Sequence, residues 1–247
     1  MSTILITGAT GTLGRPTVAA LRDSGNTIRE LSRRPGTGTT GDLLDPATLP
    51  AALAGVDTVV HLSTGKRDVE AATNLFAAAA KARVSHLVVV SIVGIDRIPF
   101  PYYVAKVAIE KATVDSGIPY TILRATQFHQ FIDNLLKAQR GLPVVFAPSF
   151  SVQPVKVEEV AVRLAELAVA APAGRVADLG GPEKREVRDL ARAWKRAAGI
   201  RRAIVPLRLP GKLFRAWRAG YGMTEQESGG GVGTFDEFLA AQYGARA

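Results

Sequence analysis

The chain has 247 residues, of which 47% are hydrophobic, enough for one large domain with a substantial core. It has no cysteine, which excludes disulfide bonds, thiolate catalysis and zinc–thiolate sites. The formal charge is +9, but the basic residues are spread along the chain without aromatic interleaving, so we expect a solvated basic surface and no nucleic-acid binding. A strand-like run starts the chain, and no apolar run reaches the ~20 residues of a membrane span, so we expect no signal peptide, no membrane partner and a cytoplasmic location.

The first residues follow the order strand, glycine turn, helix. Thr3–Thr7 is a β-branched apolar run, and Gly8, Gly11 and Gly14 then recur every third residue before a helix-like stretch. Gly8 permits a sharp turn, Gly11 lets the backbone approach a pyrophosphate, and Gly14 lets the helix lie close to the strand. The start of the helix offers N–H groups and the positive end of its dipole to phosphates. This order predicts a dinucleotide-binding turn.

The second expected strand, Asn26–Leu31, bears on the choice of cofactor. NAD-preferring sites place an acidic residue about twenty positions after the glycine turn, where it accepts the ribose hydroxyls. Here the strand runs into Ser32, Arg33 and Arg34, whose hydroxyl and guanidinium groups suit a 2′-phosphate. We therefore expect NADP(H) as the cofactor.

The next segment is expected to border the adenine. Thr37–Thr40 has the composition of a loop, and Asp42 and Leu43 then provide a carboxylate for the exocyclic amine and an apolar face beside the ring. Asp45 is expected to cap a helix that spans Pro46–Leu53, with the proline at its first position.

Polar residues follow two further strands. Thr58–Leu62 and Ser85–Ser91 are apolar runs typical of buried parallel strands. Because open α/β sheets bind ligands at the carboxyl ends of their strands, we expect the residues at these exits to lie near the ligand. They are Ser63, Thr64 and Ser91.

Tyr102 and Lys106 lie four residues apart at the start of an expected helix that ends near Ser116, so they share one face of it. A nearby ammonium favours tyrosinate and lowers the pKa of the tyrosine. Such a tyrosine can deliver a proton to a carbonyl oxygen as hydride arrives at carbon, and Ser91 could hydrogen-bond the same oxygen. Tyr103 lies three residues before Lys106 and is also roughly cofacial, so the spacing leaves the choice between the two tyrosines open.

The fifth expected strand, Tyr120–Arg124, leads to the residues expected to line the substrate pocket, Gln127, Phe128 and His129. His61 and His86 lie within expected strands, and we predict structural roles for both. The three histidines show no metal-ligand spacing, and no metal site is expected.

Beyond Gly141 the pattern changes to short strands and amphipathic helices. We interpret residues 141–247 as mainly a substrate lobe and residues 1–140 as the cofactor-binding core, within a single domain spanning 1–247. Ser228–Gly233 is a glycine-rich loop that we expect to be mobile, which makes it a candidate lid. Thr234 is expected to cap a final helix.

These motifs occur in a familiar order: TGATGTLG, the arginine pair, GDLLD, VVVSIVGID, the Tyr–Lys pair and YTILRATQFH. Together they resemble the atypical short-chain dehydrogenase/reductase superfamily and, within it, the NmrA-like, NAD(P)H-binding branch. The resemblance covers essentially the whole chain and is most specific over residues 3–130. It implies an α/β fold, a Rossmann-type doubly wound parallel sheet with a small C-terminal substrate lobe.

The same resemblance implies roles for individual residues. It places Gly8, Thr10, Gly11, Leu13 and Gly14 at the pyrophosphate, Arg33 and Arg34 at the 2′-phosphate, Asp42 and Leu43 at the adenine, Ser63 and Thr64 along the cofactor, and Ser91, Tyr102 and Lys106 near the nicotinamide, with Lys106 also holding its ribose. The chain departs from the superfamily in a slightly short gap between Ser91 and Tyr102 and in lacking an obvious asparagine at the usual fourth catalytic position.

We therefore expect an NADP(H)-dependent oxidoreductase that transfers hydride between the nicotinamide and a small organic carbonyl, alcohol or quinone-like substrate, as a monomer or homodimer. A non-catalytic NADP(H) sensor that binds a protein partner is the alternative, because some NmrA-like members lack the tyrosine. This chain keeps both Tyr102 and Lys106, which favours chemistry. A nucleotide-sugar epimerase is a third possibility, and the short C-terminal lobe and the arginine pair argue against it.

Overall fold

The computed structural model describes residues 1–34, 36 and 38–244; Pro35 and the first residue of the predicted loop, Thr37, lie outside the described residues. The chain forms two compact units that are interleaved along the sequence. The sheet unit comprises Met1–Ser91, Val104–Arg124 and Val160–Ala177, and the second unit comprises Ile92–Tyr103, Ala125–Glu159 and Asp178–Ala247.

The sheet unit is built on a seven-stranded sheet with the order β3-β2-β1-β4-β5-β6-β9. Neighbouring strands pair in parallel, so that Thr7 lies opposite His61 and His61 opposite Val89. This is the strand order of a doubly wound nucleotide-binding fold with a short strand added at one edge, which confirms the predicted fold class. The strands are β1 (Thr3–Thr7), β2 (Thr27–Ser32), β3 (Thr39–Thr40), β4 (Thr58–His61), β5 (His86–Ile92), β6 (Tyr120–Ala125) and β9 (Gly174–Arg175).

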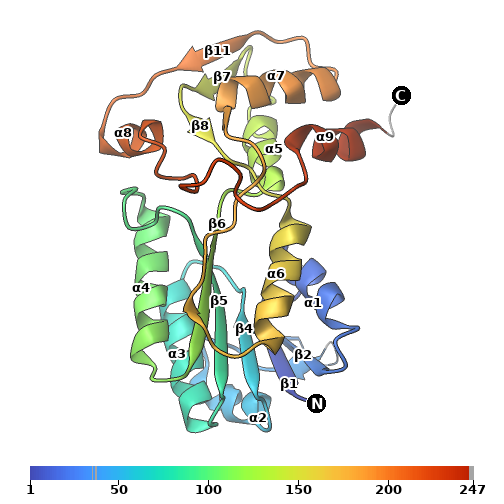
Figure 1. The fold of residues 1–247 in the computed structure, drawn as a ribbon, viewed down its shortest axis with the longest axis vertical. Helices are drawn as coiled ribbons and strands as arrows, with labels where there is room; N and C mark the ends of the chain where they lie inside the picture. Colours follow the sequence, from blue (N-terminus) through green and yellow to red (C-terminus); the bar gives the residue numbers. More distant parts are fainter. Residues whose placement is uncertain (35, 37, 245–247) are drawn as a thin grey trace. The chain divides into compact units, whose positions relative to one another are not determined.

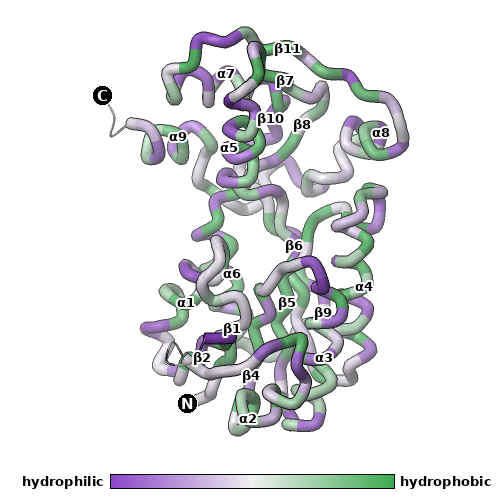
Figure 2. The backbone as a smooth tube through the Cα atoms, turned by 180° about the vertical axis from the view of Figure 1, so that it is seen from behind, coloured by the Kyte–Doolittle hydropathy of each residue, from purple (hydrophilic) through white to green (hydrophobic). Residues whose placement is uncertain are grey.

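Helices cover both faces of this sheet. The helices α3 and α4 lie on one face and α1 and α6 on the other (Figure 1), as the view from behind also shows (Figure 2). Asp45 caps the short 3-10 helix η1 as predicted, because its side chain accepts a hydrogen bond from the N–H of Ala47. The elements are α1 (Gly14–Leu21), η1 (Pro46–Thr48), α2 (Leu49–Leu53), α3 (Asp68–Lys81), α4 (Pro101–Asp115) and α6 (Val157–Val169).

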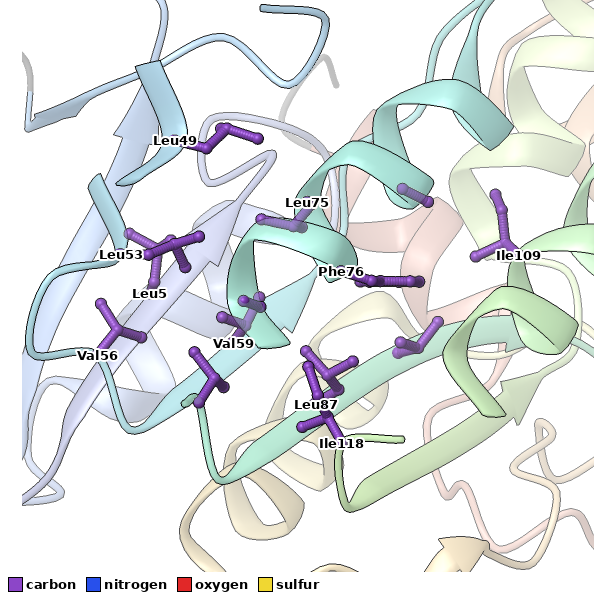
Figure 3. Close-up of a cluster of buried hydrophobic side chains, with 14 of the residues drawn as sticks. Leu5, Leu49, Leu53, Val56, Val59, Leu75, Phe76, Leu87, Ile109 and Ile118 are labelled. Atoms are coloured by element: carbon purple, nitrogen blue, oxygen red, sulfur yellow. The ribbon is translucent and has the colours of Figure 1, made fainter. Parts of the chain in front are cut away.

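An apolar core fixes the strands against the helices on one face (Figure 3). Leu5, Val59 and Leu87 from the strands belong to one cluster with Leu53 of α2 and Phe76 of α3. Each of these side chains is at most 2% exposed, and burying one contributes about 1.5–3 kcal/mol. The strands that lead to the predicted site residues are therefore anchored in an apolar core.

The second unit contains two small sheets. In one, β8 (Ser151–Val152) pairs antiparallel with β10 (Arg185–Glu186); in the other, β7 (Val145–Pro148) pairs in parallel with β11 (Ile204–Leu207). Its helices are α5 (His129–Lys137), α7 (Val187–Ala197), α8 (Lys212–Arg218) and α9 (Phe235–Tyr243). Across the described part of the chain, no helix is both long and apolar enough to cross a membrane.

A buried carboxylate joins three helices of the second unit. Asp133 of α5 accepts hydrogen bonds from Trp194 Nε1 of α7 at 2.9 Å and from the hydroxyl of Tyr243 of α9 at 2.6 Å. Its other oxygen accepts from Lys137 Nζ at 2.6 Å. The C-terminal helix is thus held by a charged group inside the unit as well as by apolar packing.

The glycine-rich loop Ser228–Gly233 makes backbone hydrogen bonds to two other segments of its unit, and its mobility stays a prediction. Its backbone pairs with the Gly180–Gly181 segment, and the N–H groups of Val232 and Gly233 donate to Glu159 Oε1 at 3.1 and 2.7 Å. Thr234 then caps α9 in a reciprocal capping box with its first-turn glutamate, which confirms the predicted cap.

Candidate functional site

In the glycine turn, the backbone packs directly against the backbone of neighbouring segments. Gly8 follows β1 with φ of +67°, and a Cβ built on it would lie 2.7 Å from the backbone nitrogen of Ser63, beyond the end of β4. A Cβ on Gly14, the first residue of α1, would overlap the carbonyl oxygen of Gly8. The N–H of Gly11 donates to that same oxygen at 2.9 Å and closes the turn. Only glycine permits these approaches, so the turn has the tight geometry expected of it.

The start of α1 presents a positive helix end. Its N-cap is the buried Leu13, which makes no side-chain capping bond, and its first turn contains no acidic residue. Thr10 and Gly11 are exposed on the turn, and Arg15 Nε donates to the carbonyl oxygen of Thr10 at 3.0 Å. Backbone N–H groups, the helix dipole and an adjacent guanidinium all favour an anion here. The residues present therefore fit a bound pyrophosphate.

Thr7, which the sequence analysis missed, holds the end of β4. Its Oγ1 accepts from the N–H groups of Leu62 at 3.1 Å and Ser63 at 3.3 Å, and it lies 2.9 Å from His61 Nδ1. Burial, together with the charge of Lys106, lowers the pKa of His61 to about 3, so the ring is neutral. With two donors already on its oxygen, the Thr7 hydroxyl donates to Nδ1, a tautomer assigned from the hydrogen-bond network. A strand threonine has no sequence signal for such a role.

Ser63 and Thr64 follow this contact. Ser63 is half-buried against the glycine turn, and Thr64 is exposed. The structure therefore brings the exit of β4 to the turn that follows β1, as expected of neighbouring parallel strands.

The end of β2 carries the arginine pair. Arg33 and Arg34 are both exposed, and the N–H of Arg34 donates to Ser32 Oγ at 3.0 Å. Two guanidinium groups therefore stand where an NAD-binding site would place a carboxylate.

The segment expected to border the adenine is also fixed. Asp42 accepts from the N–H of Leu44 at 3.0 Å. The carbonyl oxygen of Leu43 accepts from Asn74 Nδ2 of α3 at 3.0 Å, and the Leu43 side chain packs against the core. Asn74 escaped the sequence analysis because a lone asparagine within an alanine-rich helix gives no local sign of a distant partner.

Lys106 is a buried cation in the sheet unit, with 5% of its surface exposed. Burial lowers its pKa, while the carboxylates of Asp68 and Glu110 act in the opposite direction. Ser91, near the end of β5, is also buried, and its Oγ has no hydrogen-bond partner among the described residues. Ser91 thus offers an unpartnered hydroxyl near the end of β5, and Lys106 is a buried cation of the same unit.

The two adjacent tyrosines differ in their surroundings. Tyr102 is 39% exposed and lies one turn before Lys106 on α4. Tyr103 is 5% exposed, and its ring packs against Phe100 and Trp217 with centroids 5.5 and 6.4 Å apart. Burial raises the pKa of Tyr103 to about 12, against the effect of a hydrogen bond from the Gln127 side chain. Tyr103 is thus a packing residue of the second unit.

The predicted substrate residues follow β6. Gln127 is buried, its Nε2 donates to the carbonyl oxygen of Gly222 at 3.1 Å, and its Oε1 has no hydrogen-bond partner among the described residues. Phe128 is half-buried at the N-cap of α5. His129 is 1% exposed and its Nε2 lies 3.1 Å from the carbonyl oxygen of Pro154. Contact of these three residues with a substrate stays a prediction.

A family model described as NAD(P)H-binding matches residues 8–166, a span that starts at the glycine turn and includes Lys106. The chain belongs to this NAD(P)H-binding family. The match confirms the NAD(P)H-binding family that the resemblance implied, and the solved structures share the fold.

Two curated relatives and one solved structure are similar to this chain. A (4-alkanoyl-5-oxo-2,5-dihydrofuran-3-yl)methyl phosphate reductase from Streptomyces griseus is 33% identical over 212 residues, 79% of this chain and 74% of that protein. The photosystem II assembly factor Ycf39 from Trieres chinensis is 31% identical over 147 residues, 51% of this chain and 46% of that protein.

The solved structure is an NADPH-dependent quinone oxidoreductase from Escherichia coli in complex with NADPH, which matches with a TM-score of 0.84. The match covers 97% of this chain and 99% of that one. At 20% sequence identity the similarity bears on the fold alone. Together with the family match, the reductase from Streptomyces griseus places the chain in a family of NAD(P)H-dependent reductases.

Proposed function

We propose that the chain is an NADPH-dependent reductase that passes hydride to a small organic acceptor, either a carbonyl compound or a quinone-like molecule. The observation that carries the choice of NADPH is the pair of exposed guanidinium groups, Arg33 and Arg34, at the end of β2. Arginine binds phosphate by charge-assisted, often paired hydrogen bonds, and no acidic side chain follows β2 to receive the ribose hydroxyls of NAD.

Bound NADPH would supply the hydride. The residues of the chain would bind the cofactor, orient the acceptor and transfer the proton. The glycine turn and the start of α1 hold the pyrophosphate. Lys106 holds the nicotinamide ribose and stabilises the tyrosinate form of Tyr102. Tyr102 donates its proton to the acceptor oxygen as hydride reaches carbon, and Ser91 hydrogen-bonds that oxygen. The burial of Tyr103 favours Tyr102 in this role.

In this proposal Gln127, Phe128 and His129 belong to the part of the chain that recognises the acceptor, and residues beyond 140 contribute mainly to substrate binding. The similar proteins include a reductase of a furanone phosphate and a quinone oxidoreductase. We therefore propose a small carbonyl compound or quinone as the acceptor.

Cofactor titration tests the choice of NADPH. The double variant Arg33→Ala/Arg34→Ala is expected to bind NADPH at least ~10-fold more weakly, because charged hydrogen bonds contribute about 1.5–3 kcal/mol each. Its affinity for NADH should not change. The control Arg22→Ala/Arg188→Ala removes the same charge from two exposed positions, the C-cap of α1 and the first turn of α7, and should leave both affinities unchanged. Equal binding of NADPH and NADH by the unmodified protein would refute the preference.

Turnover tests the chemistry. Carbonyl and quinone acceptors are screened by following NADPH oxidation. Tyr102→Phe is expected to abolish turnover, whereas Tyr103→Phe should retain it and only lose its hydrogen bond with Gln127. A Tyr102→Phe protein with full activity would remove Tyr102 from the mechanism.

The second candidate is a non-catalytic, NADPH-binding assembly or regulatory factor. The match to the photosystem II assembly factor over about half of this chain is the observation that favours it. Tight NADPH binding without turnover of any acceptor would favour this candidate over the reductase.

A further inference from the structure

The sheet unit has a cavity at the amino ends of its strands, with a volume of about 240 Å³. Three residues of its wall, Ser2, Asp57 and Ser85, directly precede β1, β4 and β5. The C-terminal end of α6 lies at this same end of the unit (Figure 1) and lines the cavity as well. The volume is below the ~300 Å³ at which drug-sized pockets begin, so the cavity suits a small ligand. The glycine turn follows the opposite, carboxyl end of β1 and does not belong to it.

The wall of this cavity is electrically negative. Asp57 Oδ2 accepts from the N–H of Thr3 at 2.7 Å, whereas its Oδ1 has no hydrogen-bond partner among the described residues. The helix α6 ends at Val169 without a basic residue in its last turn, and Ala168–Ala170 line the cavity, so the negative end of the helix dipole is uncompensated there. Of the described residues in the wall, Asp57 alone carries a formal charge, and a cationic ligand would balance both groups.

Two nearly buried polar side chains line the cavity beside this negative wall. Thr58 of β4 and His86 of β5 are opposite each other in the sheet and are 6% and 3% exposed. The hydroxyl of Thr58 makes no hydrogen bond in the described part of the chain, although a buried polar group usually has a partner. Neither side chain is therefore accounted for by packing alone.

The hydrogen bonds of His86 leave one ring nitrogen unused. Burial lowers the pKa of His86, so the ring is neutral. Its Nε2 lies 2.9 Å from Thr121 Oγ1, which already accepts from the N–H of Ala173 at 3.0 Å. The Thr121 hydroxyl therefore donates to Nε2, and the ring proton is on Nδ1, a tautomer assigned from this network. With no partner for Nδ1 among the described residues, His86 offers a donor to a ligand oxygen.

We propose that this cavity binds a small protonated amine that also carries a hydroxyl group. The ammonium lies against Asp57 and the end of α6, while the ligand hydroxyl accepts from His86 Nδ1 and hydrogen-bonds with Thr58. A cation without an oxygen leaves the two buried polar groups unpaired, and an uncharged polyol leaves the negative wall unbalanced. The site goes beyond the proposed function and does not depend on it, because the residues proposed for reduction do not line this cavity.

Three probes of similar size separate the two requirements. Serinol carries an ammonium and two hydroxyls, isopropylamine lacks the hydroxyls, and glycerol has a hydroxyl in place of the ammonium. Each is titrated into isotope-labelled protein, and the backbone amide resonances are followed by NMR. Serinol should shift the resonances of Thr58 and His86 in a saturable way, whereas isopropylamine should bind ~5-fold and glycerol at least ~10-fold more weakly. The proposal is overturned if either simpler probe binds as tightly as serinol, or if serinol leaves these resonances unmoved.

Two conservative variants test the contacts. Asp57→Asn keeps an oxygen for the N–H of Thr3 but loses the charge, and should bind serinol at least ~10-fold more weakly. Thr58→Val keeps the shape of a side chain whose hydroxyl has no protein partner, and should weaken serinol ~3-fold or more while leaving isopropylamine unchanged. The amide spectrum itself reports whether each variant is folded.

Asp23→Asn is the matched control, because Asp23 is an exposed carboxylate of the same unit that does not line the cavity. Its affinity for serinol should equal that of the unmodified protein. Equal serinol affinities in Asp57→Asn and Asp23→Asn would overturn the proposal, and so would an equal loss of serinol and isopropylamine binding in Thr58→Val. These titrations contain no NADPH and no acceptor, so their outcome is independent of whether the protein is a reductase.

Discussion

Three alanine substitutions separate the two constraints on the glycine turn. Gly25 has φ of +71°, and among the described residues nothing lies within 4 Å of a Cβ built on it, so Gly25→Ala adds backbone strain alone. Gly14 has no left-handed φ, but its Cβ would overlap the carbonyl oxygen of Gly8, so Gly14→Ala adds overlap alone. Gly8 combines φ of +67° with a Cβ 2.7 Å from the Ser63 nitrogen, so Gly8→Ala adds both.

The expected losses of folding free energy follow from these geometries. A left-handed backbone costs a residue with a Cβ about 1–2 kcal/mol, which is the expected effect of Gly25→Ala. Overpacking costs about 1–3 kcal/mol, and Gly14→Ala recovers up to ~1 kcal/mol of this through the better helix propensity of alanine. Gly8→Ala should be the most damaging, at about 2–5 kcal/mol, because it adds the cost of a left-handed backbone to the overlap with backbone atoms.

Urea unfolding measures these losses, and fluorescence titration measures NADPH affinity. The free Gly8→Ala protein can relieve its overlap by opening the glycine turn. NADPH binding then has to close the turn again, and a strain of about 1.4 kcal/mol restored in this way weakens binding tenfold. We expect at least that loss for Gly8→Ala and Gly14→Ala and none for Gly25→Ala. The reasoning is refuted if Gly8→Ala and Gly25→Ala lose equal stability and bind NADPH equally well.

Two further predictions concern buried polar groups. Asp133→Asn should lower the free energy of unfolding by about 3 kcal/mol, because it leaves Lys137 without its buried carboxylate. The control Asp115→Asn removes an exposed ion pair and should change the free energy of unfolding by under ~0.5 kcal/mol. Urea unfolding measures both. For His61, the unfolded chain takes up a proton between about pH 6.5 and pH 3 that the folded chain does not. Stability therefore falls on acidification by up to ~1.4 kcal/mol per pH unit, and His61→Gln should remove that part of the slope in unfolding measured at about pH 5 and pH 7.

Elements with a local signal were predictable from the sequence. The run Thr3–Thr7 is the strand β1 with the predicted bounds. Its apolar periodicity and flanking turn residues lie within the segment itself. Two-residue strands carry no such period. Thr39–Thr40, predicted as loop, is a strand only because it pairs with Leu31–Ser32.

The contacts of the glycine-rich loop could not be predicted from its composition. Glycine and serine give Ser228–Gly233 the composition of a flexible segment, yet Glu159, more than sixty residues earlier, accepts its backbone N–H groups. The same limit applies at the site. The glycine spacing predicted the turn itself, whereas the contact of Thr7 with the exit of β4 depends on strand pairing, which spacing within one segment does not contain.

The choice between Tyr102 and Tyr103 depends on the same kind of information. Residues three and four positions before Lys106 both lie roughly on its side of a helix, so the spacing could not separate the two tyrosines. The ring of Tyr103 packs against Trp217, more than one hundred residues later, and its hydroxyl interacts with Gln127. Those contacts commit Tyr103 to the core of its unit and raise its pKa. Tyr102 keeps the exposure that proton transfer to a substrate requires. Comparing the activities of Tyr102→Phe and Tyr103→Phe therefore measures directly whether tertiary burial, and not helical spacing, selects the catalytic tyrosine.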